Sequence, residues 1–335
     1  MPYGIRPVGI RGTGISLPKR VLTNRDLEKI VDTSDEWITS RTGIKSRRIA
    51  DDDVTTSMLA SEAAERALRD AGIGADKIGL TIVATITPDM MFPATACLVQ
   101  DRIGAKNSAA YDLEAGCTGF IYALATGAQF VSSGIYDHVL VIGAETVSRI
   151  MDWEDRNTCV LFGDAAGAAV LGPVGEDYGV LGIDLGSDGG GGNLLDLPAG
   201  GSLHPADEGT VANKMHYLRM QGNEVFKFAV RTMSESPLRA LDIAGLDKKD
   251  IDYIVPHQAN ERIIQAALRR LQLSGDKAYI NLDRYGNTSA ASVPIALHEA
   301  KEEGKVKDGD IVVLVAFGAG LTWGSVVLRW GRGET

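Results

Sequence analysis

Cys117 is the residue of this sequence whose surroundings best suit a nucleophile. It lies in the segment AGCTGF, just before an uncharged run from Phe120 to Val131 that we expect to form a buried helix. A thiol at a helix N-terminus lies at the positive end of the helix dipole, which lowers its pKa and favours the thiolate. The alternative is a small core residue, because free cysteines are often buried. Cys97 and Cys159 lack this setting, and we interpret both as core residues.

His257 and Asn287 are the polar side chains that would complete such a site. His257 lies in VPHQAN directly after an apolar segment, and loops that follow strands in α/β sheets commonly carry functional residues. Asn287 lies in YGNTSA, before a segment rich in small residues. Each has a structural alternative: a histidine that is only hydrogen-bonded within the fold, and an asparagine that only caps the following helix.

The segment FGAG, residues 317–320, follows another apolar run and could direct backbone N–H groups at an oxyanion. A tight turn between two strands is the simpler interpretation. Ala319 stands in this turn, and its N–H stays usable if the backbone φ suits a residue with a Cβ.

Residues 34–41 are predicted to form a short helix, with Thr33 and Glu36 as a capping box at its start. Trp37 and Arg41 would then be i,i+4 neighbours on one face. An indole beside a guanidinium could hold an adenine ring by stacking and cation–π contact, although the same spacing fits a solvated surface pair.

A second group of cations shares one predicted helix after His257. It consists of Arg262, Arg269 and Arg270, and a solvated helix face is its default interpretation.

The elements that would position these residues occur twice along the chain. A helix end marked by glycine, a loop and a buried strand occur at residues 70–83 and again at 243–255. Residues 111–118 align with 281–288, and each segment is interpreted as a strand, a turn and a helix rich in small residues.

This alignment places Cys117 and Asn287 at equivalent positions of two halves. The repeat predicts a duplicated α/β fold with a pseudo-two-fold axis, in which parallel-looking apolar strands form sheets covered by helices. We expect the halves to be residues 1–175, with the nucleophile, and 176–335, with the histidine and the asparagine.

Composition limits the function classes. The chain has 335 residues, 44% of them hydrophobic and 23% charged, and a net charge of −10. That length allows a large core, and the acidic balance disfavours non-specific nucleic-acid binding. Three cysteines give no disulfide framework and fit a reducing cytoplasm, and residues 1–20 lack the apolar stretch of a signal peptide. The uncharged run 311–328 contains three glycines and many β-branched residues, which favours two strands over a membrane helix.

Taken together and in order, the motifs of this chain resemble β-ketoacyl-acyl-carrier-protein synthase III from about residue 6 to residue 331. The resemblance implies the thiolase fold, a homodimer, and no metal or cofactor, because acyl-coenzyme A is a substrate. The motifs are Gly116–Phe120, Val255–Asn260, Gly286–Ser289, Phe317–Gly320, Trp37–Ile44 and Phe162–Asp164.

The resemblance also implies a role for particular residues. Cys117 would take the acyl group, His257 and Asn287 would hold the thioester oxygen of malonyl-acyl-carrier protein during decarboxylation, and the N–H groups of Cys117 and Ala319 would form the oxyanion hole. Phe92 would lie near the acyl pocket, across a dimer interface. Coenzyme A would be bound by Thr33, Trp37, Arg41, Arg156, Gly222, Phe226 and Asn260. The acidic carrier protein would dock on Lys227, Arg262, Arg269 and Arg270.

Related condensing enzymes fit less well. Thiolases use a second cysteine in the C-terminal half, whereas all three cysteines here lie in the N-terminal half. Elongating synthases use two histidines, and position 287 is an asparagine. Plant-type polyketide synthases share Cys, His and Asn but differ in the loop around His257. A module that only binds coenzyme A or a carrier protein remains a second class, against which the intact set of three residues argues.

Overall fold

The computed structural model describes residues 6–333. Its helices are α1 (Asn24–Leu27), α2 (Asp35–Thr42), α3 (Thr56–Ala71), α4 (Thr95–Arg102), α5 (Gly119–Ser132), α6 (Glu208–Ala212), α7 (Gly222–Ile243), α8 (Glu261–Leu271), α9 (Leu282–Tyr285) and α10 (Ser292–Glu302). Its strands are β1 (Val8–Ser16), β2 (Arg20–Thr23), β3 (Ser46–Ile49), β4 (Leu80–Ala84), β5 (Ala109–Leu113), β6 (Val139–Thr146), β7 (Asp164–Pro173), β8 (Gly179–Ser187), β9 (Leu195–Asp196), β10 (Arg219–Met220), β11 (Tyr253–Pro256), β12 (Ile311–Gly318) and β13 (Thr322–Arg329).

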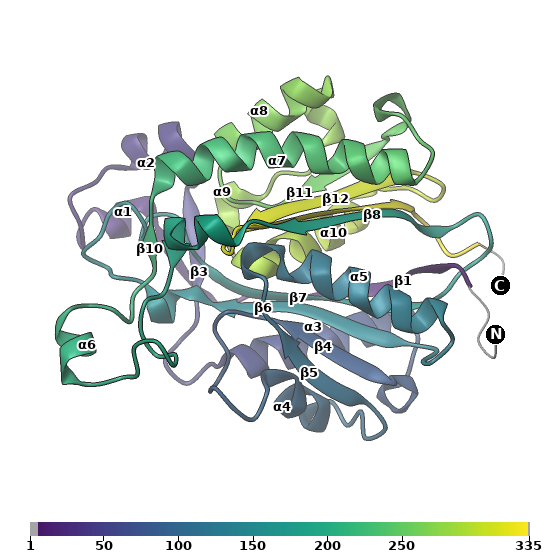
Figure 1. The fold of residues 1–335 in the computed structure, drawn as a ribbon, viewed down its shortest axis with the longest axis horizontal. Helices are drawn as coiled ribbons and strands as arrows, with labels where there is room; N and C mark the ends of the chain where they lie inside the picture. The colour runs from purple at the N-terminus through teal and green to yellow at the C-terminus, as the bar shows by residue number, and fades with distance from the viewer. Residues whose placement is uncertain (1–5, 334–335) are drawn as a thin grey trace.

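Two main sheets and three layers of helices alternate through the molecule. Figure 1 shows α7 and α8 outside one sheet, α5 and α10 between the sheets, and α3 and α4 outside the other. One sheet has the order β1-β7-β6-β4-β5, and the other has the order β11-β12-β13-β8. Because each sheet has helices on both faces, its central strand, β6 or β12, is buried along its whole length and does not alternate between apolar and polar residues.

The two sheets have the same pattern. In the first, β4 is parallel to β6, and β7 is antiparallel to β6 and β1. In the second, β11 is parallel to β12, and β13 is antiparallel to β12 and β8. The sheets are therefore mixed, and strand by strand β8, β13, β12 and β11 repeat β1, β7, β6 and β4. This confirms the predicted duplicated α/β fold, and the uncharged run 311–328 forms the paired strands β12 and β13.

The repeat is incomplete at one strand, where the sequence interpretation was wrong. Residues 111–113 belong to β5, but the aligned residues 282–285 form the short helix α9. The segment before α9 contacts β11 through a single bridge, between Ala278 and Ile254. The backbone then turns away because the N–H of Asn281 is bound by the side chain of Gln258, at 3.0 Å.

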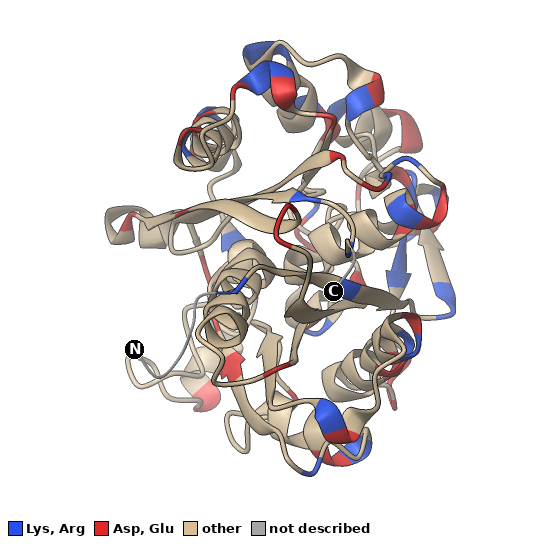
Figure 2. Ribbon diagram, turned by 90° about the vertical axis from the view of Figure 1, so that its right-hand side faces the viewer, with Lys and Arg blue, Asp and Glu red and all other residues tan. Residues whose placement is uncertain are grey.

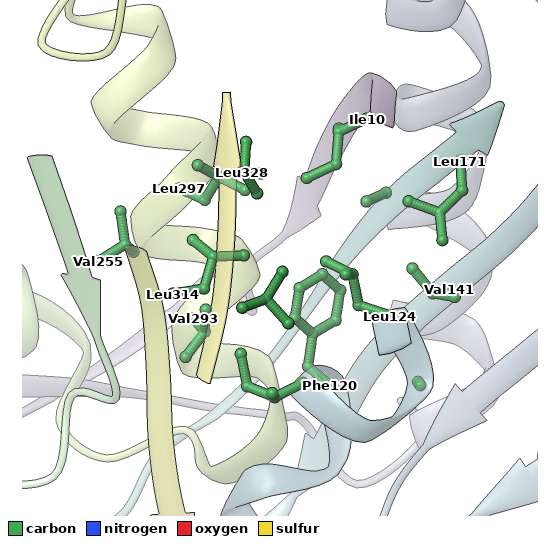
Figure 3. Close-up of a cluster of buried hydrophobic side chains, with 14 of the residues drawn as sticks. Ile10, Phe120, Leu124, Val141, Leu171, Val255, Val293, Leu297, Leu314 and Leu328 are labelled. Atoms are coloured by element: carbon green, nitrogen blue, oxygen red, sulfur yellow. The ribbon is translucent and has the colours of Figure 1, made fainter. Parts of the chain in front are cut away.

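One apolar core joins the two halves. The central helix α5 has no charged residue, and nine of its residues are buried. Phe120 and Leu124 contact residues of both sheets, including Val141 and Leu171 from the first and Leu314 from the second (Figure 3). Charged residues lie mainly on the outer helices and the loops, and the central strands are nearly free of them (Figure 2). Among the described residues, no helix has the length and apolar character needed to cross a membrane.

Helix α2 begins one residue later than its sequence suggests. Its N-cap is Ser34, whose hydroxyl accepts a hydrogen bond from the N–H of Trp37. The predicted capping box of Thr33 and Glu36 is therefore wrong, because Ser34 has the extended backbone that an N-cap needs, with φ −144°. Gly43 ends the helix in the left-handed conformation, with φ +82°.

Candidate active site

A cleft of about 440 Å³ brings together residues from both halves of the chain. Its buried lining includes Cys117, His257 and Asn287, and its exposed lining includes Arg41 and Phe226. Two segments that follow strands, the turn after β5 and the loop after β11, converge here with the end of β12. The pseudo-two-fold arrangement of the sheets places these strand ends side by side.

Cys117 lies in a 3₁₀ turn, Gly116–Thr118, immediately before α5. Its side chain is 6% exposed, and burial raises the pKa of the thiol to about 12. The nearby Glu145 also raises it, whereas the hydroxyl of Ser289 lowers it. Burial thus shifts the pKa of the thiol upward, the direction opposite to that expected from the dipole of α5. The thiol is neutral until something removes its proton.

The turn that carries Cys117 packs directly on the end of β12. A Cβ on Gly318 would lie 2.6 Å from the backbone nitrogen of Cys117, and one on Gly116 would lie 2.8 Å from the nitrogen of Ala319. Only glycine at these two positions permits this approach, and Gly116 also has φ +54°. Ala319 does not have a positive φ, so its Cβ causes no backbone strain. The N–H groups of Cys117 and Ala319 thus belong to two touching turns.

His257 follows β11 and is 1% exposed. Its backbone N–H donates to the carbonyl of Val315 at 2.8 Å, and its ring contacts that of Phe317 edge-on at 5.3 Å. Burial lowers the pKa of His257 to about 3, so the ring is neutral at physiological pH.

Ser292 contacts one ring nitrogen of His257. The distance between Nδ1 and the Ser292 hydroxyl oxygen is 2.6 Å. The backbone N–H of Gln258 points at the same oxygen, at 3.5 Å. A serine hydroxyl can donate its proton to Nδ1, and in that tautomer the proton of the neutral ring lies on Nε2.

Asn287 is held by its own backbone and by a local turn. Its N–H donates to the carbonyl of Leu161 at 2.8 Å, and its carbonyl accepts from Gly163 at 3.0 Å. The side-chain Oδ1 accepts from the backbone N–H of Ser289 at 2.9 Å. Because Oδ1 is taken, the amide NH₂ is the group left for the cleft. Asn287 does not cap the next long helix, α10, which begins at Ser292 after a 3₁₀ turn.

The outer part of the cleft contains several of the residues predicted to bind coenzyme A. Trp37, Arg41, Gly222, Phe226 and Asn260 line it. The guanidinium carbons of Arg41 and Arg156 lie 4.8 and 5.1 Å from the centre of a Trp37 ring.

Two of these predicted residues differ in their settings. Thr33 is outside the lining, and its hydroxyl is buried without a hydrogen-bond partner. Asn260 caps α8 by accepting from the N–H of Arg262, and its amide donates to the carbonyl of Arg41 at 3.1 Å.

Phe92 does not reach the cleft of its own subunit. Its side chain is 84% exposed, in a loop with Met91, which is 79% exposed. The predicted docking residues Lys227, Arg262, Arg269 and Arg270 are all exposed. Arg262 and Arg269 line one hollow beside the cleft, while Lys227 pairs with Glu224 at 2.8 Å.

Sequence reasoning missed three residues around this site: Ser292, Ser289 and Glu145. Ser289 ends the motif Gly286–Ser289, in which only Asn287 was assigned a role, and Ser292 lies in the stretch of small residues that follows it. Glu145 had a usable signal, because it is the single charge in the otherwise apolar strand VLVIGAET. Among the described residues, no group of three or more His, Cys, Asp or Glu side chains could hold a metal ion.

Comparisons with known proteins agree with this geometry. The family described as 3-oxoacyl-[acyl-carrier-protein (ACP)] synthase III matches residues 111–189, and the C-terminal part of that family matches residues 241–330. The chain is 59% identical over 325 residues to a beta-ketoacyl-[acyl-carrier-protein] synthase III of Desulfitobacterium hafniense, covering 97% of this chain and 98% of the relative. It is 60% identical over 324 residues to the enzyme of the same name from Caldanaerobacter subterraneus, with the same coverage.

Solved structures give the same result. The crystal structure of 3-oxoacyl-[acyl-carrier-protein] synthase III from Aquifex aeolicus superposes with a TM-score of 0.89 at 50% sequence identity. The match covers 96% of this chain and 100% of that one.

Proposed function

This chain belongs to the family of 3-oxoacyl-[acyl-carrier-protein] synthase III, and on that premise we propose that Cys117, His257 and Asn287 carry out its reaction. The enzyme is a condensing acyltransferase of the thiolase fold. It joins an acyl-coenzyme A to malonyl-acyl-carrier protein with loss of carbon dioxide and so initiates fatty acid synthesis. The observation that carries the assignment of residues is the single cleft in which the two halves place all three side chains.

In the first half-reaction, the sulfur of Cys117 attacks the thioester carbonyl of acyl-coenzyme A. The oxyanion that forms lies against the N–H groups of Cys117 and Ala319, and the contact between their turns supports this pairing. The Cys117 thiol loses its proton as it attacks, and the bond from the carbonyl carbon to the coenzyme A sulfur breaks. Coenzyme A leaves as a thiolate that takes a proton from solvent, and the acyl group remains on Cys117.

In the second half-reaction, the thioester oxygen of malonyl-carrier protein accepts hydrogen bonds from Nε2 of His257 and Nδ2 of Asn287. As carbon dioxide leaves, negative charge collects on that oxygen, and the two donors stabilise the enolate. The enolate carbon attacks the acyl carbonyl and expels the Cys117 thiolate. Two neutral donors suit a decarboxylation, which requires no base. The low pKa of His257 and its contact with Ser292 support this role.

Coenzyme A would occupy the outer cleft, with its adenine against Trp37. The guanidinium groups of Arg41 and Arg156 beside the indole suit a flat aromatic ring with phosphates attached. The remaining contacts would come from Thr33, Gly222, Phe226 and Asn260.

The acidic carrier protein would dock beside the same opening. Arg262 lines both the cleft and the neighbouring hollow, so a partner on α8 could pass its prosthetic arm directly into the cleft. Arg269, Arg270 and Lys227 would add positive charge to this face of an acidic protein.

The active form would be a homodimer in the cytoplasm. Strand β5 is an edge strand, and an uncovered edge can pair with a second chain. The exposed Phe92 could then reach the acyl pocket of the partner subunit. The chemistry described needs no resident metal or cofactor, since coenzyme A enters and leaves as part of the substrate.

The residue assignment is tested by trapping the acyl-enzyme. Mass spectrometry after incubation with acetyl-coenzyme A should show one adduct, and peptide mapping should place it on Cys117. Cys117→Ser should form no stable thioester, while Cys159→Ser should be acylated normally. An adduct mainly on Cys97 or Cys159 would overturn the assignment.

A further inference from the structure

Glu145 is a buried carboxyl group that neither half-reaction uses. It lies near the end of β6 and is fully buried. Its Oε2 accepts hydrogen bonds from the hydroxyls of Thr87 at 2.6 Å and Thr85 at 3.2 Å and from the N–H of Ile86 at 3.1 Å. Its Oε1 accepts from the hydroxyl of Ser289 at 2.9 Å. Among the described residues, no lysine, arginine or histidine hydrogen-bonds to this carboxyl group.

Ser289 connects Glu145 to the reacting groups. Its backbone has φ +49°, which is uncommon for a residue with a Cβ. In this conformation its N–H holds Oδ1 of Asn287 while its hydroxyl donates to Glu145. The turn of Cys117 packs against that of Ser289, and a side-chain hydrogen bond from Ser289 lowers the pKa of the Cys117 thiol. Both Ser289 and Glu145 act on the pKa of Cys117.

The charge balance of this buried group favours a shared proton. Burial raises the pKa of Glu145 to about 7 and that of Cys117 to about 12. A carboxylate and a thiolate in the same buried site repel each other. At most one of the two groups is therefore ionised at a time. Moving a proton from the thiol to the carboxylate keeps one negative charge in the site, whereas losing the proton to solvent would add a second one.

We propose that Glu145 stores the thiol proton of Cys117 while the acyl-enzyme exists, with Ser289 as the relay. As sulfur attacks acyl-coenzyme A, the S–H bond breaks, Ser289 takes that proton and passes its own to Oε1 of Glu145. When the enolate expels the Cys117 thiolate, the proton returns by the same path. The departing coenzyme A thiolate takes its proton from solvent, so Glu145 ends each cycle as it began. The proposal rests on the role of Cys117 given above.

The test is the pH profile of Cys117 reactivity, measured with iodoacetamide and separately with acetyl-coenzyme A, both by mass spectrometry. In the unmodified enzyme, both rates should rise as Glu145 ionises near pH 7 and then level off. In Glu145→Gln the plateau should vanish, and at pH 8 the rates should fall by about 10²-fold or more, the usual effect of losing a proton acceptor. Ser289→Ala should give the same profile, and the double variant should be no slower than either single one.

The matched control is Asp164→Asn, which neutralises another buried carboxyl group, one held by Ser148 and the N–H of Ala50. It should keep the unmodified pH profile. If Glu145→Gln does not fold, the pH profile of Ser289→Ala alone tests the relay. An unchanged profile, or an equal fall at every pH with the shape retained, would overturn the relay and leave Glu145 as a structural residue. These results leave the acyl adduct on Cys117 intact, whereas failure of the proposed function would remove that adduct from the unmodified enzyme.

Discussion

At the scale of single residues, burial has opposite consequences for the nucleophile and for the histidine. It raises the pKa of Cys117 and lowers that of His257, so both side chains are neutral at rest. A neutral imidazole is a hydrogen-bond donor of fixed tautomer, as the oxyanion of an enolate requires. A neutral thiol is a poor nucleophile, so the same burial makes a proton acceptor necessary.

Asn287 provides the sharpest test at this scale. Asn287→Ala should still form acyl-Cys117, because in the proposed mechanism the amide serves only the enolate. Malonyl decarboxylation and condensation should fall by about 10²–10³-fold, the usual cost of losing one oxyanion donor. Asn287→Asp should be at least as slow, since a carboxylate would repel the developing charge. The two half-reactions are measured separately, by mass spectrometry and by release of labelled carbon dioxide. Normal decarboxylation by the Asp variant would end the catalytic interpretation.

At the scale of elements, the hydroxyl groups of Thr33 and Ser34 have different roles at the N-terminus of α2. Ser34→Ala removes the cap seen in the structure and should lower the free energy of unfolding by about 0.5–2 kcal/mol. Thr33→Ala removes a hydroxyl without a hydrogen-bond partner and should leave that free energy nearly unchanged. Urea unfolding of both variants is the measurement. A larger loss in Thr33→Ala would mean that the capping box predicted from the sequence is the true one.

Helix α8 carries the prediction about docking. Charge reversal by Arg269→Glu and Arg270→Glu should raise KM for malonyl-carrier protein and leave acylation by acyl-coenzyme A nearly unchanged, because neither residue lines the cleft. Lys305→Glu is the control: it is exposed and precedes β12, whereas the cleft lies at the other end of that strand. Steady-state kinetics of each half-reaction decide the matter. Equal losses in both half-reactions would indicate misfolding instead of lost docking.

The helices, the strands and the motif residues could be predicted from the sequence. The long-range contacts that the motif residues make could not. Cys117, His257 and Asn287 could be proposed as site residues because each lies in a short motif, before an uncharged run, after an apolar segment and before a segment of small residues, respectively. Ser289 and Glu145 could not be paired, because they are 144 residues apart and meet only when the two halves pack together. The pKa of Cys117 was mispredicted for the same reason, since the dipole is local whereas desolvation comes from the whole fold.

At the scale of the whole molecule, we expect the two halves to unfold together. The first sheet comes from residues 8–173 and the second from residues 179–329, which supports the proposed division near residue 175. Yet the central core draws on both sheets. We therefore expect calorimetry to show a single unfolding transition, and the fragment 1–175 alone to be insoluble or unfolded. Two resolved transitions would show that each half is stable by itself.

The position of α5 has a further consequence for how the chain is made. This uncharged helix is complete at Ser132, but two of the second-half strands that contact it, β12 and β13, begin only at Ile311. At usual rates of translation, these strands leave the ribosome on the order of ten seconds after α5 does. During that interval the apolar surface of α5 is exposed and can bind other hydrophobic segments. Nascent chains stalled between these points should therefore bind holdase chaperones most strongly, and release should follow the emergence of β12.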